Sequence, residues 1–154
     1  MYCTINDIIS SIGRDDLINY TNDLNRTGSE VDFDSEIDEC SIIVNKMISD
    51  SVDEIDPFIE PLGFLPLTAI PNIIKNISIR ITIKNLVERR FRNEMPDSII
   101  ADYKIQLDKL EKIRTKKLKL GIEPISTDGS TSSAIKVNKT SADQVFNTDL
   151  MSRF

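Results

Sequence analysis

The chain has 154 residues, 40% of them hydrophobic and 29% charged, and a net charge of −6. This length suits one helical core with a tail, and no stretch reaches the roughly 20 apolar residues of a membrane span or resembles a secretory signal, so we expect a protein of the cytoplasm or of a particle assembled there. Histidine, the side chain best suited to proton transfer near neutral pH, is absent, and we expect no enzyme, metal or cofactor.

The first predicted helix lies between Thr4 as N-cap and Gly13 as C-cap. Its apolar side chains recur at helical spacing on one face, namely Ile5, Ile8, Ile9 and Ile12. A further turn or two of helix is expected from Asp15 to Tyr20. Residues 21–29 are too polar and turn-rich for regular structure.

A long amphipathic helix is predicted from Glu36 to Ile55, with Asp34 or Ser35 as its cap and Asp56-Pro57 as its end. Its stripe consists of Ile37, Cys40, Val44, Met47 and Ile48.

We expect Cys3 and Cys40 to be free, buried thiols, because no CxxC pair occurs. Acidic residues near the helix start do not form an EF-hand calcium loop, which needs glycine at its sixth and glutamate at its twelfth position; the acids are Asp32, Asp34, Glu36 and Asp38.

The segment from Phe58 to Leu67 is predicted to be an apolar loop, because the three prolines Pro57, Pro61 and Pro66 oppose a helix there. An apolar loop must be buried either on its own core or in a partner. We interpret four of its side chains as candidates for partner binding: Phe58, Leu62, Phe64 and Leu65.

Residues 71–93 permit two interpretations, because isoleucines at 77, 79, 81 and 83 alternate as in a strand. We favour a helix, since Pro71 suits the first helical position. One stripe then holds Ile70, Ile74, Ile77, Ile81 and Phe91, with Ile79 and Ile83 facing another chain.

A last helix is predicted from Ser98 to Lys119, closed by Gly121. Its stripe is Ile100, Tyr103, Leu107, Leu110 and Ile113. The polar stretch that follows cannot bury enough apolar surface to offset its ordering, so residues 122–154 are expected to form an extended tail. Its far end regains apolar residues, and Phe146, Leu150 and Phe154 are candidate docking anchors.

Charge is divided unevenly along the chain. Residues 1–60 carry fifteen acidic and three basic side chains, a net −12, whereas residues 61–154 carry ten acidic and sixteen basic ones, a net +6. Identical subunits could therefore pack head to tail in a ring, although solvated helix faces explain the pattern equally well.

An acidic pI near 4.7 argues against a dedicated nucleic-acid binder. If a ring surrounds DNA, the candidate channel-facing cations are Arg89, Arg90, Arg92, Lys112, Lys116, Lys117 and Lys119.

Together these elements predict an all-α fold, a small bundle of about four to five helices with a long apolar loop and an extended C-terminal tail. We divide the chain into a helical domain over residues 1–121 and a tail over residues 122–154.

Several short segments resemble the Mu-like prophage family of small head-region proteins. They are Met1–Ile9, Gly13–Ile18, the lead from Val31 into the long helix, Leu65–Leu67, Arg89–Phe91 and Val145–Phe154. The loop from Asp23 to Ser29 lacks the Asp-rich pattern of some relatives. That family is similar to the head–tail connector (adaptor, head-completion) proteins of tailed phages. The resemblance implies a dodecameric ring beneath the portal protein, contact with a stopper or tail-completion protein, DNA passing through the bore, and a place in the neck of the virion.

Two other functions remain open from the residues. One is an interaction adaptor or regulatory helical protein outside any virion, which would act through the same tail. The other is a small enzyme using carboxylates, whose mark would be a polar cleft with a strongly perturbed carboxyl group.

Overall fold

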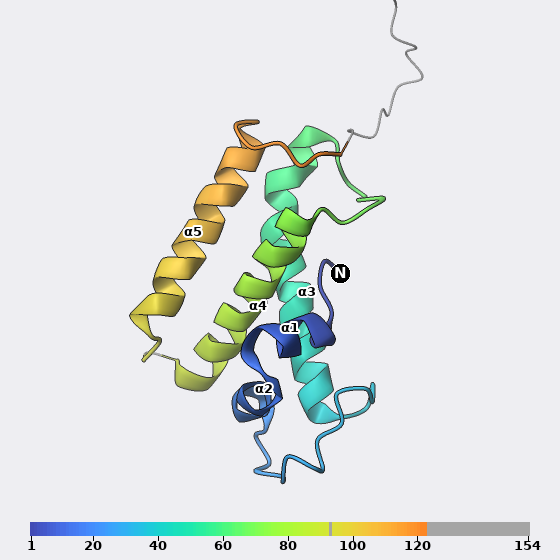
Figure 1. Cartoon of the computed structure of the whole chain (residues 1–154), viewed down its shortest axis with the longest axis vertical. Helices are drawn as coiled ribbons and strands as arrows, with labels where there is room; N and C mark the ends of the chain where they lie inside the picture. The colour runs from blue at the N-terminus through green and yellow to red at the C-terminus, as the bar shows by residue number, and fades with distance from the viewer. Residues whose placement is uncertain (93, 123–154) are drawn as a thin grey trace, which may run out of the picture.

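The computed structural model describes residues 1–92 and 94–122, and within these ranges the chain is helical, with no strand (Figure 1). The elements are α1 (Ile5–Ile12), α2 (Arg14–Thr21), α3 (Glu39–Ile59), the 3₁₀ turn η1 (Glu60–Leu62), α4 (Asn72–Phe91) and α5 (Asp97–Arg114). The predicted all-α fold and the number of helices are confirmed.

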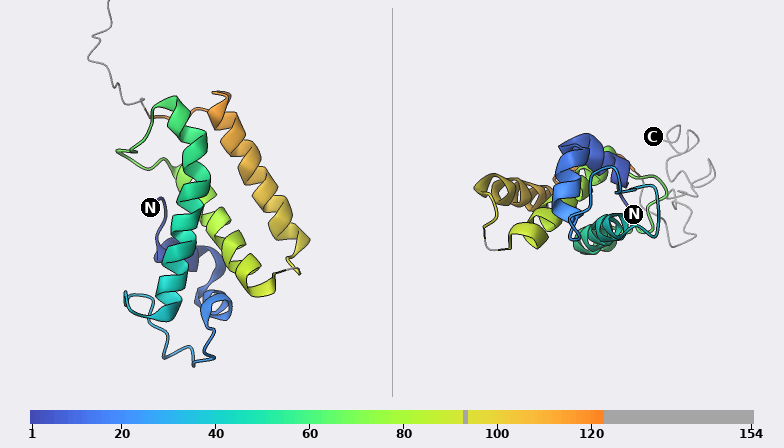
Figure 2. Two further views of the ribbon diagram at one scale, coloured as in Figure 1. Left: turned by 180° about the vertical axis from the view of Figure 1, so that it is seen from behind. Right: turned by 90° about the horizontal axis from the view of Figure 1, so that it is seen from below.

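Helices α3, α4 and α5 form an antiparallel bundle, each packed against the other two. Helices α1 and α2 cover one end of this bundle, where both contact α3 and α4 (Figures 1 and 2). The turn after α5 lies at the opposite end, beside the junction of α3 and η1.

Helix α1 has the predicted bounds because its start is fixed by neighbours in sequence. The Thr4 hydroxyl accepts a hydrogen bond from the Asp7 backbone N–H at 3.3 Å, and the Asp7 carboxylate accepts one from the Thr4 backbone N–H at 3.0 Å. This is a capping box. Helix α2 follows directly after Gly13 and is slightly longer than predicted.

The predicted bounds of α3 were wrong at both ends. The helix begins at Glu39 with Asp38 as its N-cap, because the Asp38 carboxylate accepts a hydrogen bond from the Cys40 backbone N–H at 2.8 Å. Ile37 therefore lies before the helix and is 89% exposed. At the other end the helix passes through Pro57, which is exposed in the last turn and, having no N–H, removes one backbone hydrogen bond there.

Helix α4 settles the choice between strand and helix in favour of the helix. The expectation that Ile83 faces another chain was wrong, since Ile83 is 4% exposed inside the fold. Helix α4 contacts α1, α2, α3 and α5, so it buries more than one stripe. Ile70 and Phe91, at its two ends, stay 44% and 45% exposed and do not extend the predicted stripe.

Helix α5 ends at Arg114, five residues before the predicted Lys119. The chain then turns back, with Lys116 in a left-handed conformation and the Leu118 N–H donating to the Lys112 carbonyl at 3.0 Å. This turn brings Leu120 to 9% exposure against the bundle. The cations of residues 116–119 thus lie on a turn and not on a helix.

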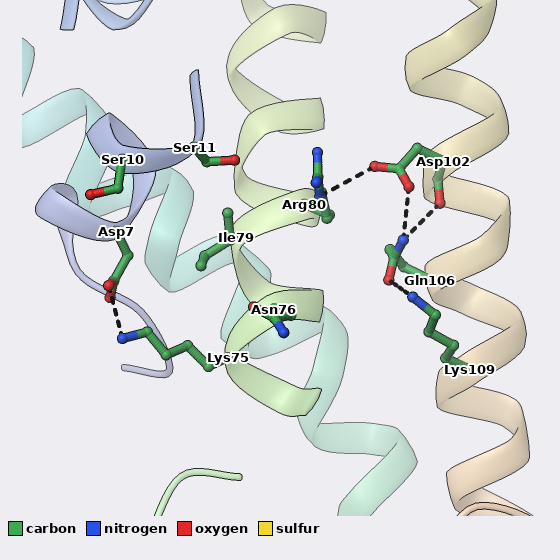
Figure 3. A pocket seen from close by; sticks show the side chains of 10 residues that line it. All are labelled: Asp7, Ser10, Ser11, Lys75, Asn76, Ile79, Arg80, Asp102, Gln106 and Lys109. Atoms are coloured by element: carbon green, nitrogen blue, oxygen red, sulfur yellow. Dashed lines mark hydrogen bonds and ion pairs between the residues drawn. The ribbon is translucent and has the colours of Figure 1, made fainter. Parts of the chain in front are cut away.

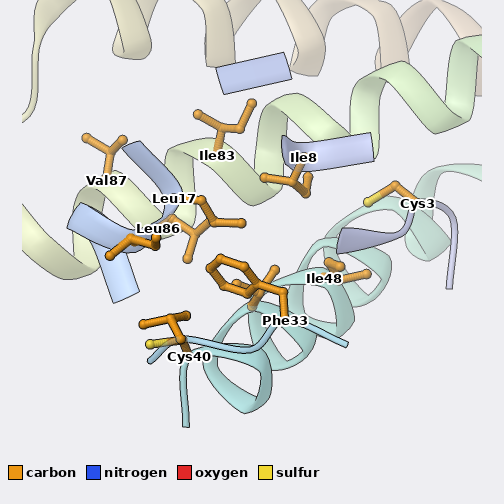
Figure 4. Packing of buried hydrophobic residues seen from close by; sticks show 12 residues of the cluster. Cys3, Ile8, Leu17, Phe33, Cys40, Ile48, Ile83, Leu86 and Val87 are labelled. Carbon is orange, nitrogen blue, oxygen red and sulfur yellow. The ribbon is translucent and has the colours of Figure 1, made fainter. Parts of the chain in front are cut away.

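Two buried clusters follow each other along the bundle. The lower core joins α1, α2, the residues before α3, the first half of α3 and the second half of α4 (Figure 4). The upper core joins the other halves of α3 and α4 with α5; its members are Tyr2, Ile55, Ile59, Ile74, Ile77, Ile81, Leu110, Ile113 and Leu120.

Small polar side chains occupy the crossing of α3 and α4. Ser51 and Ser78 are fully buried with their hydroxyl oxygens 2.8 Å apart, and the Cys3 Sγ lies 3.3 Å from the Ser78 oxygen. Burial raises the pKa of the Cys3 thiol. Both Cys3 and Cys40 are buried and free, as predicted.

Candidate interaction surfaces

The predicted apolar loop is only partly a loop. Phe58 belongs to α3 and Leu62 to η1, while Phe64 and Leu65 follow Gly63. All four side chains are half-buried and pack against the upper core. The chain's own core therefore buries much of the apolar surface of these four side chains. That they also bind a partner stays a prediction.

An apolar groove opens at the upper end of the bundle, where η1 meets the turn after α5. We call it the terminal groove. It has a volume of about 510 Å³, and its apolar lining consists of Leu62, Phe64, Ile113, Leu118, Leu120 and Ile122. Lys116 and Lys119 also line it. This volume falls in the range of about 300–1,000 Å³ that is typical of ligand pockets in proteins.

The candidate channel-facing cations lie at opposite ends of the bundle. Arg89, Arg90 and Arg92 end α4, whereas Lys112 ends α5 and the other three lysines follow it. Because α4 and α5 are antiparallel, the two groups are separated by roughly the 30 Å length of a 20-residue helix (Figure 1). The fold does not bring them into one stripe.

The cations at the end of α4 have partners inside the fold. The Arg89 guanidinium donates hydrogen bonds to the Asp23 carboxylate and, at 3.3 Å, to the Tyr20 carbonyl. Arg90 lies 3.7 Å from the same carboxylate. A hydrogen bond from Arg89 lowers the pKa of Asp23 more than burial raises it. These contacts fasten the end of α4 to the loop after α2, and a role in contacting DNA stays a prediction.

Exposed carboxylates gather at one end of the bundle, where Arg90 and Arg92 are also exposed, and exposed lysines gather at the other end. Asp32, Asp34 and Glu36 are exposed on the segment before α3, beside α2. Lys116, Lys117 and Lys119 are exposed on the turn after α5, at the far end. We call these the acidic end and the basic end. Within residues 1–92 and 94–122, no three Asp, Glu or Cys side chains are grouped so that they could hold a metal ion.

A polar groove between α1, α4 and α5 was missed by sequence reasoning (Figure 3). Lys75 on α4 pairs with Asp7 on α1 at 2.8 Å, and Arg80 on α4 lies 3.7 Å from Asp102 on α5. Burial raises the pKa of Asp7, but hydrogen bonds from Lys75 and Thr4 outweigh this, and the pKa is lowered. Charged pairs between separate helices leave no periodic signal in the sequence, which explains the omission.

Buried polar side chains complete this groove. Gln106 is 3% exposed, accepts a hydrogen bond from Lys109 at 2.9 Å, and donates one to Asp102 at 2.9 Å. The groove therefore holds two charged pairs between helices, Lys75 with Asp7 and Arg80 with Asp102, an arrangement that fastens the helices together.

The predicted tail anchors Phe146, Leu150 and Phe154 lie outside the described residues, as does the tail from residue 123 onward. Of the helices in the part that the structure describes, none combines the length and the apolar character of a membrane span.

Comparison with known proteins gives one family. A family model described as Bacteriophage Mu, Gp36 matches residues 2–139, a span that includes all five α-helices and the terminal groove. No curated protein matches the chain. The predicted resemblance to Mu-like phage proteins is confirmed.

Proposed function

The chain belongs to the Bacteriophage Mu Gp36 family, and from this premise we propose that it is a structural protein of the neck that joins the head to the tail in a phage or phage-like particle. The observation that carries the proposal is the family match, which extends over every described helix. In this role the protein assembles from the host cytoplasm into a ring, twelve-fold by resemblance, beneath the portal protein.

The distribution of exposed charge supports a subunit that is stacked between two other layers. Its acidic and basic ends point in opposite directions along the bundle axis. A ring of parallel subunits then presents the acidic end, where Arg90 and Arg92 are also exposed, to one neighbouring layer and the basic end to the other, with the portal protein on one side and the stopper or tail-completion protein on the other. Complementary potentials of this kind guide the orientation of assembling partners more than they add affinity.

Lateral packing by charge alone receives less support than the sequence pattern suggested. Part of the division between acidic and basic halves is neutralised inside the fold, by the Lys75–Asp7 pair and by Arg89 with Asp23. Side-to-side contact in the ring therefore depends on apolar surface as well, including the exposed side chains of Ile42 on α3 and Ile105 on α5.

Contacts with the neighbouring layers are assigned to the tail and to the loop after η1. A polar tether followed by Phe146, Leu150 and Phe154 suits a segment that reaches across to another protein. DNA in transit would meet the bore without sequence readout, through cations such as Lys116 and Lys117.

Deleting the gene from the phage or prophage tests this function. We expect DNA-filled heads and complete tails that do not join, and we expect an added copy of the gene to restore joined particles. Joined, infectious particles without the protein would overturn the proposal.

A charge-reversed set of variants tests the orientation. Replacing Lys116, Lys117 and Lys119 together by glutamate should abolish co-purification with the portal or the tail-side protein. The matched control replaces three exposed cations elsewhere: Lys46, Arg80 and Lys104. Equal loss of binding in both sets would contradict a specific role for the basic end.

A further inference from the structure

We propose that, in the free subunit, the terminal groove binds residues 145–154 of its own chain, so that the docking anchors are covered before assembly begins. Binding of the tail to the groove is a property of the unassembled protein and is tested apart from the proposed function; only the statement that it covers docking anchors rests on that function.

The terminal groove is built for an apolar segment. Six of its nine lining residues are apolar, and Ile113 and Leu120 form a floor continuous with the upper core, at 1% and 9% exposure. Leu62, Phe64 and Leu118 are half-buried and form its walls. The polar groove between α1, α4 and α5, in contrast, is occupied by paired charges.

The sequence beyond the groove offers a matching segment. Phe146, Leu150 and Phe154 recur every four residues, the spacing that brings side chains onto one face of a helix. The segment from 145 to 154 carries one acidic and one basic side chain, Asp149 and Arg153, so its side-chain charge is balanced and the match with the groove is one of apolar character.

The position of the groove favours the chain's own tail over other occupants. Ile122, the last described residue, lines the groove itself, so the tail starts where its docking site lies. The 22 residues 123–144 are mostly polar in sequence, and a flexible chain of that length would have a root-mean-square span of roughly 25 Å. A tether of this length gives an effective concentration in the millimolar range, which a second copy or a partner reaches only at high concentration.

A spin-label experiment on the full chain tests the proposal. A nitroxide attached at Ser152→Cys reports on nearby methyl groups by NMR, and the native thiols do not compete because both are buried. We expect the methyl signals of Leu62, Leu118 and Ile122 to be broadened several-fold more than those of Ile42 and Ile105, which lie on exposed faces of α3 and α5. The effect should be unchanged by tenfold dilution.

Matched tail variants identify the anchors. Replacing Phe146 and Leu150 together by serine should abolish the broadening, whereas replacing Ile135 and Val137 by serine, which removes two apolar side chains from the tether, should preserve it. Either pair leaves the helical bundle intact, as its circular dichroism would verify.

Two results would overturn the inference. One is equal broadening at the groove and at the control methyls. The other is broadening that fades on dilution and appears between a spin-labelled chain and a separate isotope-labelled chain, because the occupant would then be a second copy.

Discussion

Asp38 and Arg26 form a two-pronged ion pair that fixes where the longest helix begins. The two terminal guanidinium nitrogens donate to the two carboxylate oxygens at 2.8 and 2.9 Å, and the Asp38 side chain is 6% exposed. The same carboxylate accepts backbone hydrogen bonds from Cys40 at 2.8 Å and Asp32 at 3.2 Å. One side chain thus joins the loop after α2, the acidic end and the start of α3.

Replacing Asp38 should lower the free energy of unfolding, by an amount that depends on the residue introduced. We expect Asp38→Ala to lower the free energy of unfolding by about 2–4 kcal/mol, since it removes an N-cap and leaves a guanidinium without its partner. Asn is an equally good N-cap, so Asp38→Asn should cost only about 1–2 kcal/mol. Urea unfolding followed by circular dichroism measures both; equal losses would mean that the N-cap contributes nothing beyond the ion pair, and a neutral Asp38→Asn would mean that the ion pair contributes nothing beyond the cap.

Stability should fall in acid because of the same carboxylate. Hydrogen bonds from Arg26 hold the pKa of Asp38 well below its usual range, and Arg89 lowers that of Asp23. A lowered pKa in the folded state means that the unfolded chain binds more protons as the pH falls. The stabilisation is therefore complete above the unfolded pKa of about 4 and is lost progressively as the pH falls from there toward the lowered values.

Urea midpoints at pH 7, 4 and 3 measure this loss. The Asp38→Asn variant should show a shallower decline than the native chain, because it has already lost the titrating group. Parallel declines would contradict the assignment of the acid sensitivity to Asp38.

The two thiols should be unreactive in the native protein. Cys3 and Cys40 are 4% and 1% exposed, and burial raises the pKa of Cys3, so little reactive thiolate reaches solvent. A thiol-reactive chromophore should report no rapid reaction in buffer and two thiols per chain in denaturant. The added thiol of the Ser152→Cys variant serves as the comparison. One fast-reacting native thiol would show that its cluster opens readily.

Ile83 should matter for folding and not for assembly. It is 4% exposed in the lower core, so Ile83→Ala is expected to lower the free energy of unfolding by about 2–5 kcal/mol through transfer and cavity costs. Ile105→Ala, at a site 54% exposed, should change it by less than about 0.5 kcal/mol. Thermal unfolding at two protein concentrations separates the alternatives: a side chain that faced another chain would leave monomer stability unchanged and weaken association.

The sequence was most informative where structure is decided by neighbouring residues. The bounds of α1 depend on Thr4, Asp7 and Gly13, all within the element or next to it, and they were predicted correctly. The start of α3 was not, because Asp34, Ser35 and Asp38 are all competent caps. Arg26 decides between these caps because its side chain pairs with Asp38. Since Arg26 lies twelve residues before Asp38, a local sequence pattern gives no sign of this pairing.

Predictions of which side chains are buried also failed where burial depends on residues distant in the sequence. Periodicity placed Ile83 off the main stripe of α4 but gave no sign that α1 and α2 cover that face. For Phe64 and Leu65, apolar character alone does not decide between the chain's own core and a partner, since either environment removes them from water. The terminal groove was missed because it forms only when the turn after α5 brings Leu118 and Leu120 back beside Leu62.

Gly13 offers a sharp test of the connection between α1 and α2. Its φ of +89° and ψ of 156° lie in a region that is essentially restricted to glycine, and no heavy atom would lie within 4 Å of an added Cβ. Gly13→Ala should therefore cost about 1–3 kcal/mol from backbone strain alone, without a steric clash. The matched control is Gly28→Ala, where the added Cβ would lie 3.6 Å from Ile18 Cδ1, an ordinary contact. That change should be neutral or stabilise the protein by up to about 1 kcal/mol, because it restricts the unfolded chain. Urea midpoints compare the stabilities of the two variants. Equal changes in stability would show that the backbone conformation at Gly13 does not require glycine.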